Sequence, residues 1–260
     1  MIPKMMFATF SHWGHILLFF GSGVCGGVAN SIAGGGSFFT FPAMLLAGIP
    51  ALGANISSSI ATLGGYGGGL SEFRHEIAAR RRLLVRLAPV CVAGTVAGAE
   101  ILLASPASTF RVVVPWLVGA STVAFALAPR LAAPTPAHPV TGPRASARLV
   151  LGVFVLSVYG GYFGSGVGIM LLALLALTIG GDLRASQGIR LSLACMMNCV
   201  TTIIFVAHGT LFVTAIVVAG VGMAVSGVLG ARLISRLSTV VARRVIIAIG
   251  AATTLRLAWG

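Results

Sequence analysis

Two short glycine-rich motifs stand inside apolar sequence, and their residue types suit the binding of a small anion. The first is residues 33–37 (AGGGS) and the second is residues 164–168 (GSGVG). Glycine interrupts a helix and lets a ligand or another backbone approach closely. Helices that begin at Ser37 and Val167 would point unpaired N–H groups at the break, and such groups attract anions. The alternative interpretation is that the glycines only allow tight helix packing.

The two motifs lie at matching points of two apolar halves. Aligning Gly35 with Gly166 sets an offset of 131 residues, and the same offset pairs Gly21 with Gly152. Helix-breaking segments at corresponding positions of a duplicated membrane sequence are typical of the substrate site of a secondary transporter.

Arg190 is the charged residue that best fits a binding role. It stands about six residues into an apolar segment, where a charge is costly and usually functional or paired. We expect it to attract or bind an anion, and the alternative is that its side chain extends to the cytoplasmic interface. At the matching position of the first half stands Ser59.

Amide and hydroxyl side chains cluster in and beside the segments that follow each motif. A polar side chain in hydrocarbon needs a partner, so these residues either join helices or line a permeation path. The predicted substrate-binding residues are Asn30, Gly35, Gly36, Ser37, Asn55, Ser58, Gly166, Gly168, Gln187, Arg190 and Asn198.

The remaining chemistry-bearing residues predict no catalytic site, no metal site and no cofactor. Glu100 is the only carboxylate inside an apolar segment, near its outer end, and it either relays protons or lies at the interface. Glu72 and Glu76 are expected to pair within a basic loop, and Asp182 to cap a helix. No nucleophile stands in a pattern with a base. We therefore expect a protein that is not an enzyme.

Cys195 and Cys199 stand one helical turn apart and could bind a soft metal. The alternative is that they pack as small apolar residues. Metal binding would suit a membrane assembly or metal-delivery factor.

The composition is that of an all-α membrane protein. Of 260 residues, 57% are hydrophobic and 8% charged, and the mean hydropathy is +1.04. A soluble domain carries roughly 25% charged residues. The apolar runs are continuous and do not alternate, so they predict helices rather than a barrel. The net charge of +13 comes from loop residues, so we expect membrane lipids and no nucleic acid as partners.

The sequence divides into a first repeat at 1–130, a proline-rich cytoplasmic linker at 131–147 and a second repeat at 148–260. Two of the apolar runs are too short to cross a hydrocarbon core of about 30 Å, because 12 residues span only about 18 Å as a helix. We expect each to form a re-entrant hairpin with the helix before it. The apolar segments are 14–33, 37–48, 51–70, 85–104, 110–129, 149–163, 167–180, 185–207, 211–232 and 242–259.

Arginine positions predict the orientation. Basic residues concentrate in 72–86 in the first half and in 232–244 in the second, which are not equivalent loops. Because such loops stay in the cytoplasm, the two halves should form inverted repeats in the cytoplasmic membrane, with both termini outside. The hairpins would enter from opposite sides, and their glycine turns would meet near the midplane. The first turn, followed by Pro42, should break its helix more strongly than the second.

Both motifs and their surroundings resemble the TauE/SafE family of sulfite and sulfonate exporters. The resemblance rests on Gly27–Ser37, Pro42, 48–50 and 54–55 in the first half, and on 160–168, Ala185, Asn198 and 208–209 in the second. Val167 and Ala173 depart from the glycine and proline usual in the family.

The resemblance implies a secondary transporter, an exporter or a facilitator, for a small anion such as sulfite, a sulfonate or a related carboxylate. Transport would proceed by alternating access around the two hairpins. A channel-like pore is the alternative, besides the metal-delivery factor. A homodimer is compatible with each of these functions.

Overall fold

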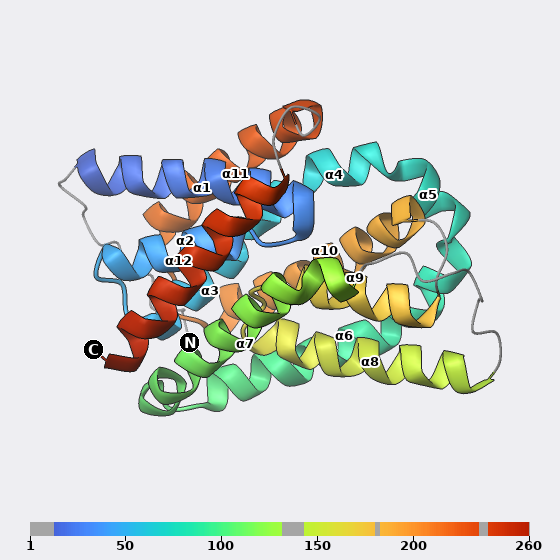
Figure 1. The fold of residues 1–260 in the computed structure, drawn as a ribbon. Coiled ribbons are helices and arrows are strands. Elements are labelled where there is room, and N and C mark those ends of the chain that lie inside the picture. The colour runs from blue at the N-terminus through green and yellow to red at the C-terminus, as the bar shows by residue number, and fades with distance from the viewer. Residues whose placement is uncertain (1–12, 132–142, 180–182, 234–238, 260) are drawn as a thin grey trace.

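The computed structural model describes residues 13–131, 143–179, 183–233 and 239–259, and its elements there are helices (Figure 1). The first half contains α1 (Trp13–Ala33), α2 (Ser37–Leu46), α3 (Ala51–Thr62), the 3₁₀ turn η1 (Leu63–Gly65), α4 (Tyr66–Glu72), α5 (Arg74–Ala79), α6 (Arg81–Ala104) and α7 (Ala107–Leu131). The second contains α8 (Pro143–Tyr162), α9 (Val167–Thr178), α10 (Leu183–His208), α11 (Val213–Leu233) and α12 (Thr239–Trp259). Each predicted apolar segment is largely helical where the structure describes it, which confirms the all-α class.

Three of the described helical segments are long and apolar enough to cross a membrane: Arg81–Ala104, Ala107–Leu127 and Arg184–His208. Shorter apolar helical segments include Ser37–Leu46 and Val167–Thr178, which follow the two glycine motifs. Their length agrees with the prediction that neither crosses the membrane alone.

Two segments differ from the sequence prediction. The run 51–70 is not one helix, because the chain tightens into η1 at Leu63–Gly65 and resumes as α4. Glycine weakens a helix by about 1 kcal/mol per residue, and this stretch holds five of them at 64–69. The basic stretch 72–86 is largely helical rather than a loop, since α5 and the start of α6 lie within it.

The structure describes only the two ends of the predicted linker, residue 131 and residues 143–147. α8 begins at Pro143, inside the predicted linker, and proline is favoured at the first position of a helix. The stretch 132–142 lies outside the described residues.

Close helix pairs link the two halves. α1 packs along α11 and α6 along α8, and the two pairs occupy opposite sides of the bundle (Figure 1). Glycines permit both contacts: a side-chain carbon on Gly23 would overlap the carbonyl of Ala219, and one on Gly98 would overlap that of Val158. Small residues let membrane helices approach at backbone distance.

The direction of each pair follows from which residues meet. α1 and α11 run the same way, as do α6 and α8, whereas α7 and α12 run in opposite directions. The contacts that show this are Gly23 with Ala219, Gly27 with Met223, Gly94 with Phe154, Gly98 with Val158, Gly119 with Thr254 and Gly250 with Thr122.

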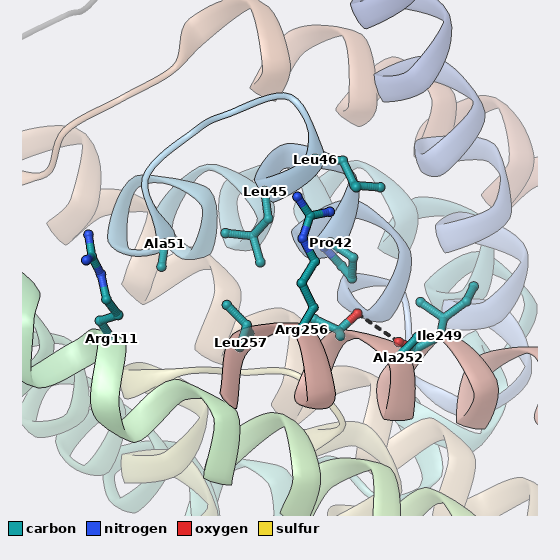
Figure 2. Close-up of a pocket in the computed structure, with 10 residues that line it drawn as sticks. Pro42, Leu45, Leu46, Ala51, Arg111, Ile249, Ala252, Arg256 and Leu257 are labelled. Carbon is teal, nitrogen blue, oxygen red and sulfur yellow. Dashed lines mark hydrogen bonds between the residues drawn. The ribbon is translucent and has the colours of Figure 1, made fainter. Parts of the chain in front are cut away.

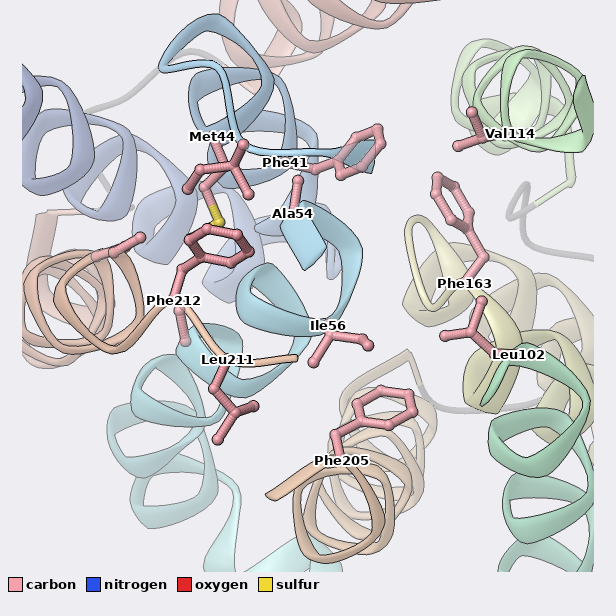
Figure 3. Packing of buried hydrophobic residues seen from close by; sticks show 14 of the residues in the cluster. Phe41, Met44, Ala54, Ile56, Leu102, Val114, Phe163, Phe205, Leu211 and Phe212 are labelled. Carbon is pink, nitrogen blue, oxygen red and sulfur yellow. The ribbon is translucent and has the colours of Figure 1, made fainter. Parts of the chain in front are cut away.

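An aromatic core holds the two hairpins together (Figure 3). Phe41 of α2 meets Phe163, which follows α8, with ring centroids 5.6 Å apart and ring planes at 87°. Both rings are buried, and such edge-to-face pairs are favourable beyond the area they bury. The helix of the first hairpin is therefore packed on the turn of the second.

Candidate functional site: the contact between two glycine turns

The two helix breaks are built by left-handed glycines. Residues 34–36 join α1 to α2, with Gly34 at a φ of +77°. Residues 163–166 join α8 to α9, with Gly164 at +80° and Gly166 at +76°. Residues with a side chain adopt this conformation only with strain.

The expectation that the first break is the stronger one is wrong. The second connection is one residue longer and uses two left-handed glycines, while the first uses one. Pro42 lies inside α2 without ending it. The left-handed glycines therefore form the two breaks, and Pro42 is not part of either turn.

The turns of the two halves contact each other, as the sequence predicted. A side-chain carbon placed on Gly168 would lie 2.9 Å from the Cα of Gly34, so no other residue fits either position without a shift. Ser165 donates a hydrogen bond from its hydroxyl to Ser37 Oγ at 2.9 Å. The contact therefore joins residues more than 120 positions apart in the sequence.

Arg190 of α10 lies against this contact. Its Nη1 would be 2.9 Å from a side-chain carbon on Gly168 and would collide with one on Gly34. The side chain is 1% exposed, so it does not extend to the cytoplasmic interface. Its Nε and Nη2 are buried without a hydrogen-bond partner among the described residues.

An unpaired buried guanidinium is costly. The penalty for removing an ion from water is several kcal/mol, and it is offset only by a counter-charge with good geometry. Among the described residues, Arg190 is the one charged side chain in the buried set. The arrangement is chemically suited to accept a small anion at Arg190, beside the contact of the two glycine turns.

Tyr66 and Asn198 form a polar pair beside Arg190. The Asn198 amide donates to the Tyr66 hydroxyl at 2.9 Å and to the carbonyl of Ala194 at 3.0 Å. Tyr66 is buried and close enough to Arg190 to interact with it electrostatically. Because its oxygen already accepts a hydrogen bond, the hydroxyl proton of Tyr66 is free to be donated elsewhere.

Three other predicted residues carry buried amides. Asn55 donates to the carbonyl of Tyr162 at 3.1 Å and so ties α3 to the end of α8. Nδ2 of Asn30 and Oε1 of Gln187 are buried without a hydrogen-bond partner among the described residues. Such unpaired groups are rare in folded proteins and suit ligand contacts.

Four predicted residues make packing contacts. Ser58 pairs with Thr40 at 2.6 Å and holds α3 to α2. Gly35 faces the ring of Phe125, and Gly36 faces the carbonyl of Gly26. Gly166 has the same character, because it packs against Ser121 and Phe38.

Glu100 does not belong to the group of residues around Arg190 and the two glycine turns. Glu100 is exposed on α6. Sequence reasoning left Gly34, Ser165 and Tyr66 out of the site. The first two were visible as motif members, and the offset of 131 residues pairs them with each other.

Cys195 is half-buried and Cys199 is exposed. The part of the chain that the structure describes adds no third histidine, cysteine or carboxylate to form a metal group with them.

Glu76 of α5, outside the candidate membrane-spanning helices, pairs with Arg184 at the start of α10 at 2.8 Å, not within its own basic segment. The hydrogen bond from Arg184 lowers the pKa of the Glu76 carboxyl below its usual value. Arg184 also lies 5.4 Å from the centre of the Phe73 ring. α5 rests on Gly188, two residues from Arg190, so this ion pair fastens one end of the bundle. Asp182, the predicted helix cap, lies outside the described residues.

Comparison with known proteins shows the family of this chain. A family model described as sulfite exporter TauE/SafE matches residues 19–257. The chain belongs to the TauE/SafE family. A curated relative from Sinorhizobium sp., named "Probable membrane transporter protein ORF9", is 30% identical over 174 residues. That match covers 66% of each chain, so it spans slightly less than two thirds of the relative's length. No solved structure matches the chain.

Proposed function

We propose that this protein is a secondary membrane transporter, an exporter or facilitator, for a small anion. The observation that carries the proposal is the buried guanidinium of Arg190, which has two nitrogens without a protein partner at the contact of the two glycine turns. An anion in hydrogen-bonding reach of these nitrogens would satisfy the charge and both donors. Membership of the TauE/SafE family supports the transport function.

The proposed substrates are sulfite, a sulfonate or a related organosulfur or carboxylate anion. The description of the family supports the first of these. The chemistry of the cluster supports the class, because one positive charge among neutral donors suits a small oxyanion. Tyr66 could donate its hydroxyl proton to such an oxyanion, as could the Asn30 amide.

Alternating access is the proposed mechanism, with inverted repeats as its basis. Two features support it. The pairing of α1 with α11 corresponds to that of α8 with α6 when the halves are exchanged. Within each pair the two helices run parallel to each other. The cluster is also closed to solvent, since Arg190 is 1% exposed and Ser165 3%. Opening would proceed by moving one hairpin against the other while the glycine contact parts.

The test is flux of radiolabelled sulfite and sulfoacetate in proteoliposomes, with and without a proton gradient. Saturable flux of either anion that disappears in Arg190→Ala is expected, whereas Arg190→Lys should retain part of it. Flux that never saturates and discrete single-channel currents would instead indicate a pore. Absence of anion flux together with copper in the purified protein would favour a metal-delivery factor.

Glu100 is proposed as a candidate for proton coupling from its position in an apolar helix. Since it is exposed on α6, it would exchange protons at the surface of the bundle and not at Arg190. In the same assay, loss of the gradient effect in Glu100→Gln with unchanged downhill flux would support this role. An unchanged response to the gradient would exclude it.

A further inference from the structure

Two apolar pockets lie away from the contact of the two glycine turns, and Arg111 lines both of them. The first, of about 520 Å³, lies between α2, α7 and α12 (Figure 2). The second, of about 440 Å³, lies between α7 and α12. Arg111 and Leu257 line both pockets, so these two residues form the ridge between them.

The walls of the first pocket are apolar apart from three side chains. The hydroxyl of Thr253 is engaged, because it donates to the carbonyl of Ile249 at 2.7 Å. Arg111 and Arg256 remain, and neither forms an ion pair in the described part of the chain. The four carboxylates of the sequence stand at 72, 76, 100 and 182, so α2, α7 and α12 carry none.

The arginines lie where a membrane surface would be. Arg111 is near the beginning of α7, and Arg256 is in the last turn of α12, so antiparallel packing places both at the same end of the bundle. Trp116, which lines the second pocket, is 79% exposed. Exposed tryptophans beside arginines are typical of the boundary between lipid chains and headgroups.

We propose that this surface binds one anionic phospholipid. Arg111 and Arg256 hold the phosphate, and the acyl chains occupy the two pockets on either side of the ridge formed by Arg111 and Leu257. The apolar walls favour a lipid over a soluble anion, which would leave them uncovered. Because cations near a membrane surface attract anionic headgroups, the two arginines select against zwitterionic lipids.

The lipid would touch the transport machinery through α2. Pro42, Leu45 and Leu46 form one wall of the first pocket, and α2 is the helix that follows the first glycine turn. An acyl chain there would fill the space between α2 and α12 and so brace the first hairpin.

Native mass spectrometry of the purified chain tests the proposal. Phosphatidylglycerol and phosphatidylcholine with identical acyl chains are added at equal concentration, and the retained copies are counted. We expect wild type to retain one phosphatidylglycerol in preference. Arg111→Gln and Arg256→Gln should each weaken that retention about five-fold. Arg244→Gln is the matched control, since Arg244 is an exposed residue of α12 outside both pockets.

A second variant tests the pocket without changing charge. Ala252→Phe places a ring in the first pocket and should lower retention of both lipids. Equal retention of the two lipids by wild type would overturn the proposal, as would an equal loss in Arg244→Gln. Displacement of phosphatidylglycerol by an equal concentration of inorganic phosphate would also overturn it, by indicating a soluble-anion site. Elution as a single species shows that each variant is folded.

Discussion

Replacing Arg190 by methionine should stabilise the substrate-free protein and abolish transport. In the structure the guanidinium is 1% exposed, and its Nε and Nη2 have no protein partner among the described residues. Replacing a buried charge by an apolar side chain of similar size is often neutral or stabilising by about 1–4 kcal/mol. At about 2–4 °C per kcal/mol, a gain of about 1–4 kcal/mol in Arg190→Met should raise the melting temperature by roughly 2–16 °C.

Arg190→Met should weaken the binding of substrate, although it stabilises the substrate-free protein. An anion that accepts hydrogen bonds from both unpaired nitrogens gains about 1.5–3 kcal/mol from each. Losing at least 3 kcal/mol weakens binding by more than about 100-fold. Substrate should therefore raise the melting temperature of wild type and leave that of Arg190→Met unchanged.

The assay combines thermal unfolding in detergent with flux in proteoliposomes. Arg184→Met is the matched control, because Arg184 is on the same helix but exposed and paired with Glu76. It should keep most of the flux and shift the melting temperature little, since exposed ion pairs contribute at most about 1 kcal/mol. If Arg190→Met lowers the melting temperature and Arg190→Lys restores it without restoring flux, the arginine is structural and the reasoning fails.

Three further predictions concern other parts of the chain. Gly34→Ala should reduce flux at least ten-fold, because its φ of +77° is strained for alanine and the new methyl meets Arg190, whereas Gly67→Ala in open space should not; equal losses in the two variants would contradict this. Because the pKa of Glu76 is lowered, its ion pair stabilises the fold above the usual value of 4.5 and is lost as pH falls through the lowered pKa. The small difference in melting temperature between wild type and Glu76→Gln should thus vanish in acid, and a difference that grows there would refute it. In a cysteine-free background, an impermeant maleimide should label Ala79→Cys only from inside and Ser108→Cys only from outside; labelling of both from one side would refute the predicted topology.

The sequence alone predicted the helices, the membrane class and the family. Apolar runs and glycine motifs are local signals, because helix formation depends on neighbouring residues and a glycine changes the backbone conformation at its own position. The arginine positions, through the inverted topology that they indicate, also predicted that the two turns would meet. Local signals failed where glycines interrupt an apolar run, as at Leu63–Gly65.

Tertiary structure decided which residues of the motifs face the site. Gly35 and Gly36 were predicted to bind substrate; in the structure they pack against Phe125 and Gly26, while Gly34 faces Arg190. Adjacent glycines are equivalent in sequence, and only the packing of surrounding helices distinguishes them.

The position of the Arg190 side chain was also decided by tertiary structure. Its sequence position allowed either a buried charge or a side chain that reaches the membrane surface, since long basic side chains do both. The fold places it against Gly34 of the other half, more than 150 residues away in the chain. That contact exists because α1, α6, α8 and α11 pair across the halves, and such pairing depends on the shapes of helices far apart in sequence. The sequence determined that a charge lies in an apolar segment, and the tertiary structure decided that it lies against the contact of the two glycine turns.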